Sequence, residues 1–275
     1  MKVAALQMVS GTALDANLAR ARGLLAHAAD AGAELAVLPE YFCVLGRSDR
    51  DKLALRENFG SGPVQDFLAQ AAQTYKLWIV GGTVPLTSSD PERARNSTLV
   101  YAPTGQCVAR YDKMHMFRFT DGAHSFDETR TLEPGTEPVT FDLPSADGHT
   151  WRVGLSICYD LRFPELYRHL RADLLLVPSA FTFTTGQAHW AMLLRARAVE
   201  NLAYVLAAAQ GGLHENGRRT WGHSLLVDPW GEVLAERTHE GCGIVVGDVL
   251  KPRLVAVRAQ MPSLDHGVLR VRSGP

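Results

Sequence analysis

The stretch "VGLSICYDLRFPELYRHL" (153–170) places one cysteine, Cys158, between an apolar run and a segment with the character of a helix. A thiol with a pKa of about 8.5 is mostly protonated near neutral pH, so a cysteine nucleophile needs a base or a nearby cation. Glu40 ends the apolar run "ELAVLPE", and Lys113 ends the second strand-like run of "STLVYAPTGQCVARYDK". A carboxylate can accept the thiol proton, and a lysine can stabilise negative charge on a carbonyl oxygen. These residue types therefore predict nucleophilic catalysis by cysteine.

Each of these residues also has an ordinary interpretation. A cysteine is most often a buried apolar side chain, and a charged residue at the end of a strand is most often solvated. His115, close to Lys113, has the interpretation of a structural or surface histidine. A papain-like Cys-His pair is disfavoured because the C-G-[SA]-C-[WY] signature is missing. The predicted helix after Cys158 would favour a thiolate or an oxyanion through its free N–H groups and its dipole.

The composition of the chain limits its compartment and partners. Its 275 residues carry a formal charge of -1 and have a pI near 6.8, so nothing indicates binding to nucleic acid or an anionic membrane. No signal-peptide pattern and no run of about 18 apolar residues is present, which predicts a cytoplasmic protein. The cysteines are too far apart for a C-x-x-C metal or redox motif: Cys43, Cys107, Cys158 and Cys242.

Hydrophobic periodicity predicts one α/β domain, residues 1–275, in which strands alternate with helices. Several apolar runs have no polar alternation, as in strands that are covered on both faces. The expected strands are 2–8, 34–40, 77–82, 151–158, 173–180 and 204–210. The expected helices are 15–31, 63–75, 163–172 and 190–202, and the expected hairpins are 97–113 and 223–236.

Two segments of the chain are similar to each other. "ELAVLPE" and "DLLLVPS" are apolar runs that end alike, and a hairpin follows in each half of the chain. This favours two related halves packed as layers, and the antiparallel hairpins argue against a uniform parallel barrel. Ligands of such folds gather at the carboxyl ends of strands, where Glu40, Lys113 and Cys158 are expected.

The motifs around these residues resemble the nitrilase superfamily of carbon–nitrogen hydrolases. Glu40 in "LPE", Lys113 in "DKMH" and Cys158 in "CYDLRFPE" match its Glu-Lys-Cys triad in order and rough spacing. "FDETRTLEPG" resembles the segment with a second glutamate, here Glu128, and "GQAHWAMLLRARAVEN" and "GHSLLVDPWGEVLAE" resemble two later motifs. The resemblance extends over residues 3–257.

The resemblance implies a four-layer αββα sandwich, in which two sheets are flanked by helices, and a homodimer. It also implies that Glu40 deprotonates Cys158, whose sulfur attacks an amide carbon and forms a thioester. Lys113 and the backbone N–H of Tyr159 would stabilise the oxyanion, and Glu128 would orient the lysine or the water. No metal or organic cofactor is expected.

Within the superfamily, the chain resembles the branch that contains deaminated-glutathione amidase and omega-amidase. This implies hydrolysis of deaminated glutathione to 2-oxoglutarate and Cys-Gly. The alternative is omega-amidase activity on 2-oxoglutaramate or another small aliphatic amide. A non-catalytic binding or scaffold role is a third interpretation. Two segments near the expected pocket, 40–46 and 115–126, do not discriminate between the two amidases.

The resemblance also suggests how the substrate is held. Arg162, with Phe181 and Thr185, would lie against the carboxylate of the bound acid, and a guanidinium fork suits a carboxylate. In the alternative interpretations, Arg162 pairs with Glu165 or braces a dimer contact, and Phe181 is a core aromatic.

Overall fold

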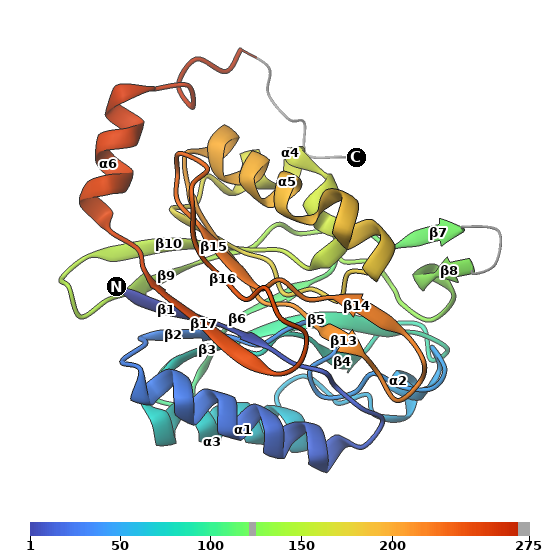
Figure 1. Ribbon diagram of the computed structural model, residues 1–275. Helices are drawn as coiled ribbons and strands as arrows, with labels where there is room; N and C mark the ends of the chain where they lie inside the picture. The colour runs from blue at the N-terminus through green and yellow to red at the C-terminus, as the bar shows by residue number, and fades with distance from the viewer. Residues whose placement is uncertain (121–124, 269–275) are drawn as a thin grey trace.

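Two mixed β-sheets form the centre of the computed structural model, which describes residues 1–120 and 125–268 (Figure 1). The first sheet has the strand order β17-β1-β2-β3-β5-β4, and β6 also pairs with β5. Its strands β1, β2 and β3 are parallel, and the others are antiparallel to their neighbours. The strands are β1 (Lys2–Gln7), β2 (Leu35–Val37), β3 (Trp78–Val80), β4 (Val84–Thr87), β5 (Ala94–Tyr101), β6 (Cys107–Asp112) and β17 (Gly243–Asp248). Residues 121–124 of the 115–126 segment lie outside the described residues.

The second sheet repeats this arrangement, with the order β16-β15-β12-β11-β10-β9. Strands β10, β11 and β12 are parallel, β9 is antiparallel to β10, β15 is antiparallel to β12, and β16 is antiparallel to β15. The strands are β9 (Thr140–Pro144), β10 (Thr150–Leu155), β11 (Leu174–Leu176), β12 (Tyr204–Ala207), β15 (Leu225–Val227) and β16 (Val233–Glu236). The similar runs noted in the sequence are β2 and β11, the middle parallel strands of the two sheets.

Helices cover the outer face of each sheet, which confirms the predicted αββα sandwich (Figure 1). α1 (Leu14–Asp30) and α3 (Pro63–Tyr75) lie on the first sheet, and α4 (Pro164–Leu170) and α5 (Phe183–Asn201) lie on the second. Smaller elements are α2 (Asp51–Ala54), α6 (Lys251–Gln260), the ribbons β7 (Arg118–Thr120)–β8 (Ser125–Asp127) and β13 (Gly211–Leu213)–β14 (Arg219–Trp221), and the 3-10 helices η1 (Glu128–Arg130) and η2 (Cys158–Arg162). Across residues 1–120 and 125–268, no helix is long and apolar enough to span a bilayer.

The alternation of side chains along β1 explains the layering. Successive residues of a strand point to opposite faces. Val3 and Ala5 pack into the core that includes the second sheet, whereas Ala4 and Leu6 pack into the core that includes α1 and α3. A strand buried on both faces needs an unbroken apolar run, which is the pattern observed.

Two boundaries differ from the expectation in ways that affect the site. The predicted helix 190–202 begins earlier, at Phe183, because the Thr182 side chain caps it by accepting a hydrogen bond from the Thr185 N–H at 3.4 Å. Strand β10 ends at Leu155, so Cys158 does not end the strand but begins the 3-10 helix η2.

Candidate active site

Three connections at the carboxyl ends of strands bring the predicted triad together. Glu40 follows β2, Lys113 directly follows β6, and Cys158 follows β10. Glu40 and Lys113 are each 1% exposed, and Cys158 is 8% exposed. The first two residues come from the first sheet and the cysteine comes from the second, so the site lies where the two sheets meet.

The Lys113 ammonium lies between two carboxylates. Its Nζ donates to Glu40 Oε1 at 2.9 Å, and to Glu128 Oε2 and Oε1 at 2.8 and 3.0 Å. Burial alone would lower the pKa of Lys113, but the charges of Glu128 and Glu40 outweigh it and hold that pKa well above its usual range. Lys113 is therefore a fixed positive charge at the site.

Further hydrogen bonds orient the Glu40 carboxylate. The Asn96 side-chain amide donates to Oε1 at 2.9 Å, and the Ala180 backbone N–H donates to Oε2 at 3.0 Å. Because Ala180 follows β11 in the second sheet, Glu40 is held from both sheets. Its orientation is thus set before any substrate enters.

Two further hydrogen-bond donors, one to each carboxylate oxygen, hold Glu128 against Lys113. The Tyr41 hydroxyl donates to Oε1 at 2.9 Å, and the Phe117 backbone N–H donates to Oε2 at 2.8 Å. Burial alone would raise the pKa of Glu128, but the Lys113 charge outweighs burial, and the pKa of Glu128 is lowered. The geometry fits a residue that positions the lysine.

Cys158 adopts a backbone conformation that is uncommon for a residue with a side chain. Its φ is 49°, in the left-handed region that costs an L-residue about 1–2 kcal/mol. The Cys158 N–H donates to Pro178 O at 2.9 Å, which helps to hold this sharp turn. Within the described part of the chain, the next N–H, that of Tyr159, has no hydrogen-bond acceptor, so it is free to bind an oxyanion beside the sulfur.

The regular helix expected after Cys158 does not begin at the thiol itself. Regular helix α4 begins only at Pro164, beyond the 3-10 helix that contains Cys158. Burial raises the pKa of the Cys158 thiol well above its ordinary value, the Glu40 charge raises it further, and Lys113 opposes both. The resting nucleophile is therefore a neutral thiol beside a carboxylate base.

Asp160 is a buried carboxylate that sequence reasoning missed. Its Oδ2 accepts hydrogen bonds from the Ile157 N–H at 2.8 Å and the Tyr111 hydroxyl at 2.7 Å. Its Oδ1 accepts from the His115 N–H at 3.1 Å and lies 2.7 Å from Nδ1 of that ring. Tyr111 and His115 flank Lys113 in the sequence. Asp160 therefore links the turn at Cys158 (the cysteine turn) to residues 111–115 (the lysine segment). The one sequence signal was an aspartate two residues after the candidate nucleophile.

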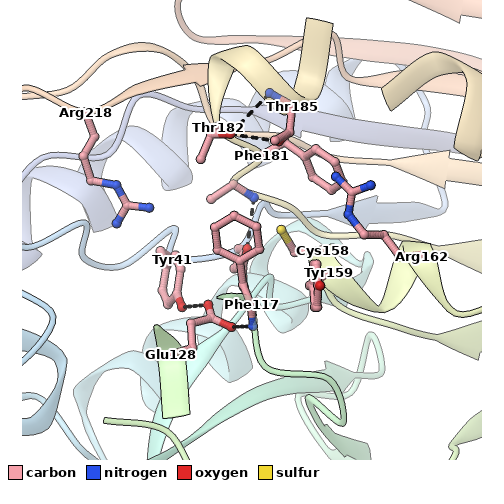
Figure 2. Close-up of a pocket in the computed structure, with 12 residues that line it drawn as sticks. Tyr41, Phe117, Glu128, Cys158, Tyr159, Arg162, Phe181, Thr182, Thr185 and Arg218 are labelled. Carbon is pink, nitrogen blue, oxygen red and sulfur yellow. Dashed lines mark hydrogen bonds between the residues drawn. The ribbon is translucent and has the colours of Figure 1, made fainter. Parts of the chain in front are cut away.

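The substrate-binding residues predicted from the sequence line the same pocket as Cys158 (Figure 2). The Arg162 guanidinium lies 5.8 Å from the Tyr159 ring centre and 5.6 Å from that of Phe181. It does not pair with Glu165; its only side-chain hydrogen-bond partner among the described residues is His189, at 3.3 Å.

The other two predicted binding residues have structural contacts as well. Phe181 is buried and packs on Trp190, with ring centres 4.9 Å apart, so it is both a core aromatic and part of the pocket wall. The Thr185 hydroxyl lies 2.8 Å from that of Thr182 at the start of α5. Both side chains are therefore fixed in place.

Arg218, which sequence reasoning did not single out, also lines this pocket. Figure 2 shows its side chain and that of Arg162 on opposite sides of Cys158. Among the described residues, the charged side chains that line the pocket are two carboxylates and two guanidiniums, and the Lys113 ammonium is hydrogen-bonded to both carboxylates. This arrangement favours an anionic ligand. Across residues 1–120 and 125–268, no cluster of His, Cys, Asp or Glu is placed to hold a metal ion.

Comparison with known proteins gives a consistent assignment. The family model described as carbon-nitrogen hydrolase matches residues 2–259. A deaminated glutathione amidase of Synechocystis sp. is 42% identical over 272 residues, which cover 96% of this chain and 97% of that protein. An omega-amidase of Homo sapiens is 36% identical over 266 residues, which cover 95% and 92%.

A solved structure is informative about the cysteine. It is a mutant amidase from Nesterenkonia sp. AN1, with a TM-score of 0.75 and 25% identity, and the match covers 98% of this chain and 97% of that one. It carries the acetamide moiety of fluoroacetamide, added covalently at the active-site cysteine.

Proposed function

The chain belongs to the carbon–nitrogen hydrolase family of the nitrilase superfamily, and we propose that it is an amidase whose acyl carrier is Cys158. The observation that carries this proposal is the arrangement of Glu40 and Lys113 beside the thiol: their side chains are hydrogen-bonded to each other at 2.9 Å, buried and oriented in advance. The cysteine adduct in the Nesterenkonia amidase supports the choice of nucleophile.

In the first half of the reaction, Glu40 accepts the thiol proton while Sγ of Cys158 attacks the amide carbon. Lys113 Nζ and the Tyr159 N–H bind the developing oxyanion, which is stabilised most by donors that are already in position. When the tetrahedral intermediate collapses, Glu40 gives its proton to the leaving amine. A thioester on Cys158 remains.

In the second half, Glu40 accepts a proton from a water molecule that attacks the thioester carbon. The second tetrahedral intermediate collapses, the acid leaves, and the proton on Glu40 returns to the sulfur. Glu128 keeps Lys113 aimed at the oxyanion throughout. One carboxylate serves both halves because its protonation state alternates between them.

The substrate we propose is deaminated glutathione, which is hydrolysed to 2-oxoglutarate and Cys-Gly. Support comes from the 42% identical relative of that name and from two arginines at the pocket without carboxylate partners among the described residues. Arg162, enclosed by aromatic rings, would bind the carboxylate of the 2-oxo acid, with Phe181 and Thr185 beside it. Omega-amidase activity on 2-oxoglutaramate is the second candidate, because of the human relative. We also propose a cytoplasmic location.

A substrate panel tests this function with purified protein. It compares deaminated glutathione, 2-oxoglutaramate, simple aliphatic amides, N-carbamoyl amino acids and nitriles by release of amine or acid. We expect the highest kcat/KM with deaminated glutathione and no turnover by Cys158→Ala. Turnover of nitriles or carbamoyl compounds alone would contradict the substrate assignment. Normal turnover by Cys158→Ala would contradict the mechanism, and no turnover of any member by the wild type would favour a binding role.

A further inference from the structure

Arg218 presents its guanidinium to the pocket. It lies 5.3 Å from the Phe126 ring centre, and no carboxylate among the described residues lies within ion-pair distance of it. The adjacent Arg219 differs, because its guanidinium is paired with Glu240. A guanidinium with no counterion beside a nucleophile is suited to bind an anionic group of the substrate.

The turn that carries Arg218 is held rigidly. The His214 N–H donates to Arg218 O, and the Gly217 N–H donates to His214 O, both at 2.9 Å. The buried His214 ring lies 2.9 Å from Ser10 O through Nδ1 and 2.8 Å from the Thr220 hydroxyl through Nε2. The backbone position of Arg218 is therefore fixed before substrate binds, which lowers the entropy cost of using it as a ligand.

The two arginines occupy different parts of the pocket. Arg162 lies between aromatic rings on the α4 side, whereas Arg218 lies on the other side of Cys158 (Figure 2). The part of the pocket that Arg218 lines adjoins an outer groove, which Arg218, Thr182 and Asn216 also line. If the acyl half of a substrate is held by Arg162 with its carbonyl at the sulfur, the amine half extends toward Arg218.

We propose that Arg218 binds a carboxylate of the leaving amine, so that the preferred substrates are amides with a carboxylate on each side of the scissile bond. The assignment rests on the proposed amidase function and narrows its substrate class. Deaminated glutathione meets the requirement, because its leaving group Cys-Gly ends in a carboxylate. 2-Oxoglutaramate does not, because its leaving group is ammonia.

A matched pair of substrates tests the role of Arg218. One is deaminated glutathione, and the other is its analogue with the terminal carboxylate replaced by a carboxamide. For Arg218→Gln, kcat/KM for the carboxylate substrate should fall about 10- to 100-fold more than for the carboxamide, as expected for loss of a charge-assisted hydrogen bond. Arg218→Lys, which keeps the charge but loses the fork, should recover part of the difference.

Two further variants separate a direct contact from a general field effect. Arg219→Gln removes a different charge from the same turn. Because the Arg219 guanidinium is already paired with Glu240, this variant should keep the preference for the carboxylate substrate. Arg162→Gln should lower kcat/KM for both substrates alike. Equal losses for both substrates in Arg218→Gln, or an equal loss of preference in Arg219→Gln, would overturn the assignment while leaving the amidase function standing. No turnover of either substrate by the wild type would overturn both proposals.

Discussion

At the scale of single residues, the central feature is a buried thiol whose charged form is disfavoured. Burial and the Glu40 charge raise the pKa of Cys158, and the Lys113 charge and a hydrogen bond from the Ala180 backbone oppose them. A standing thiolate beside Glu40 would place two negative charges together in a region of low dielectric. We therefore expect Glu40 to accept the proton as the sulfur attacks.

A thiolate titration tests this feature. The ultraviolet thiolate absorbance of the wild type, minus that of Cys158→Ala, should stay near zero from about pH 6 to 9, because a raised pKa keeps the thiol protonated there. In Glu40→Gln the carboxylate charge is gone while burial and the Lys113 charge remain, so the pKa should fall and the signal should appear at lower pH. A thiolate already formed near neutral pH in the wild type would contradict the account.

Residue patterns identified only part of the site. Local motifs contain Glu40, Lys113, Glu128 and Cys158. In the structure the two glutamates and the cysteine line one pocket, and Lys113 is hydrogen-bonded to both glutamates. The position of Arg218 could not be predicted, because a surface turn with two arginines has no local feature that marks one as unpaired. That difference arises only from the tertiary fold, which places Glu240 beside Arg219 alone.

At the scale of elements, the site depends on short connections rather than on the strands themselves. The sequence indicated the strands and both hairpins, because apolar runs and turn residues are local signals. It did not indicate that Cys158 begins a 3-10 helix with positive φ. That conformation is set by Asp160, whose carboxylate is bound by donors from a distant segment, Tyr111 and His115.

Asp160→Asn tests the link between the cysteine turn and the lysine segment. The amide turns one acceptor oxygen into a donor facing other donors, so the free energy of unfolding should fall by about 2–4 kcal/mol and kcat should fall as well. Chemical denaturation and steady-state kinetics measure the two effects. Asp142→Asn, at an exposed position of β9, is the matched control and should change stability by less than about 0.5 kcal/mol. Equal effects in the two variants would contradict this role of Asp160.

At the scale of the whole molecule, the site exists only when both halves are assembled. Glu40 and Lys113 follow strands of the first sheet, Cys158 and Ala180 follow strands of the second, and hydrogen bonds such as that from Ala180 to Glu40 join them. The related halves were visible in the sequence as the similar runs that became β2 and β11. The sequence did not show which connections of each half would form the site, because that depends on how the two sheets face each other.

The homodimer remains a proposal that the outer face of the molecule supports. Large apolar side chains are exposed on α5 and the β15–β16 hairpin, namely Met192 (61%), Val199 (43%), Trp230 (48%) and Leu234 (43%). Apolar side chains gathered on one face favour association with a second copy. We expect a mass of twice 30.1 kDa by light scattering, and a shift to the monomer in Met192→Glu.

A matched variant controls for the added charge. Val108→Glu changes a similarly exposed apolar residue on β6 of the first sheet, 42% exposed, and should leave the dimer intact. A wild type that remains at 30.1 kDa at every concentration would contradict the proposed dimer. Dissociation by both variants would contradict the choice of interface.

The most direct test of the central claim is to trap the acyl-enzyme. The protein is mixed with deaminated glutathione, quenched in acid during turnover, digested and analysed by mass spectrometry. We expect a thioester-linked 2-oxoglutaryl group on the peptide that contains Cys158, with no such adduct in Cys158→Ala. An adduct on Cys43, Cys107 or Cys242, or full turnover by Cys158→Ala, would contradict it.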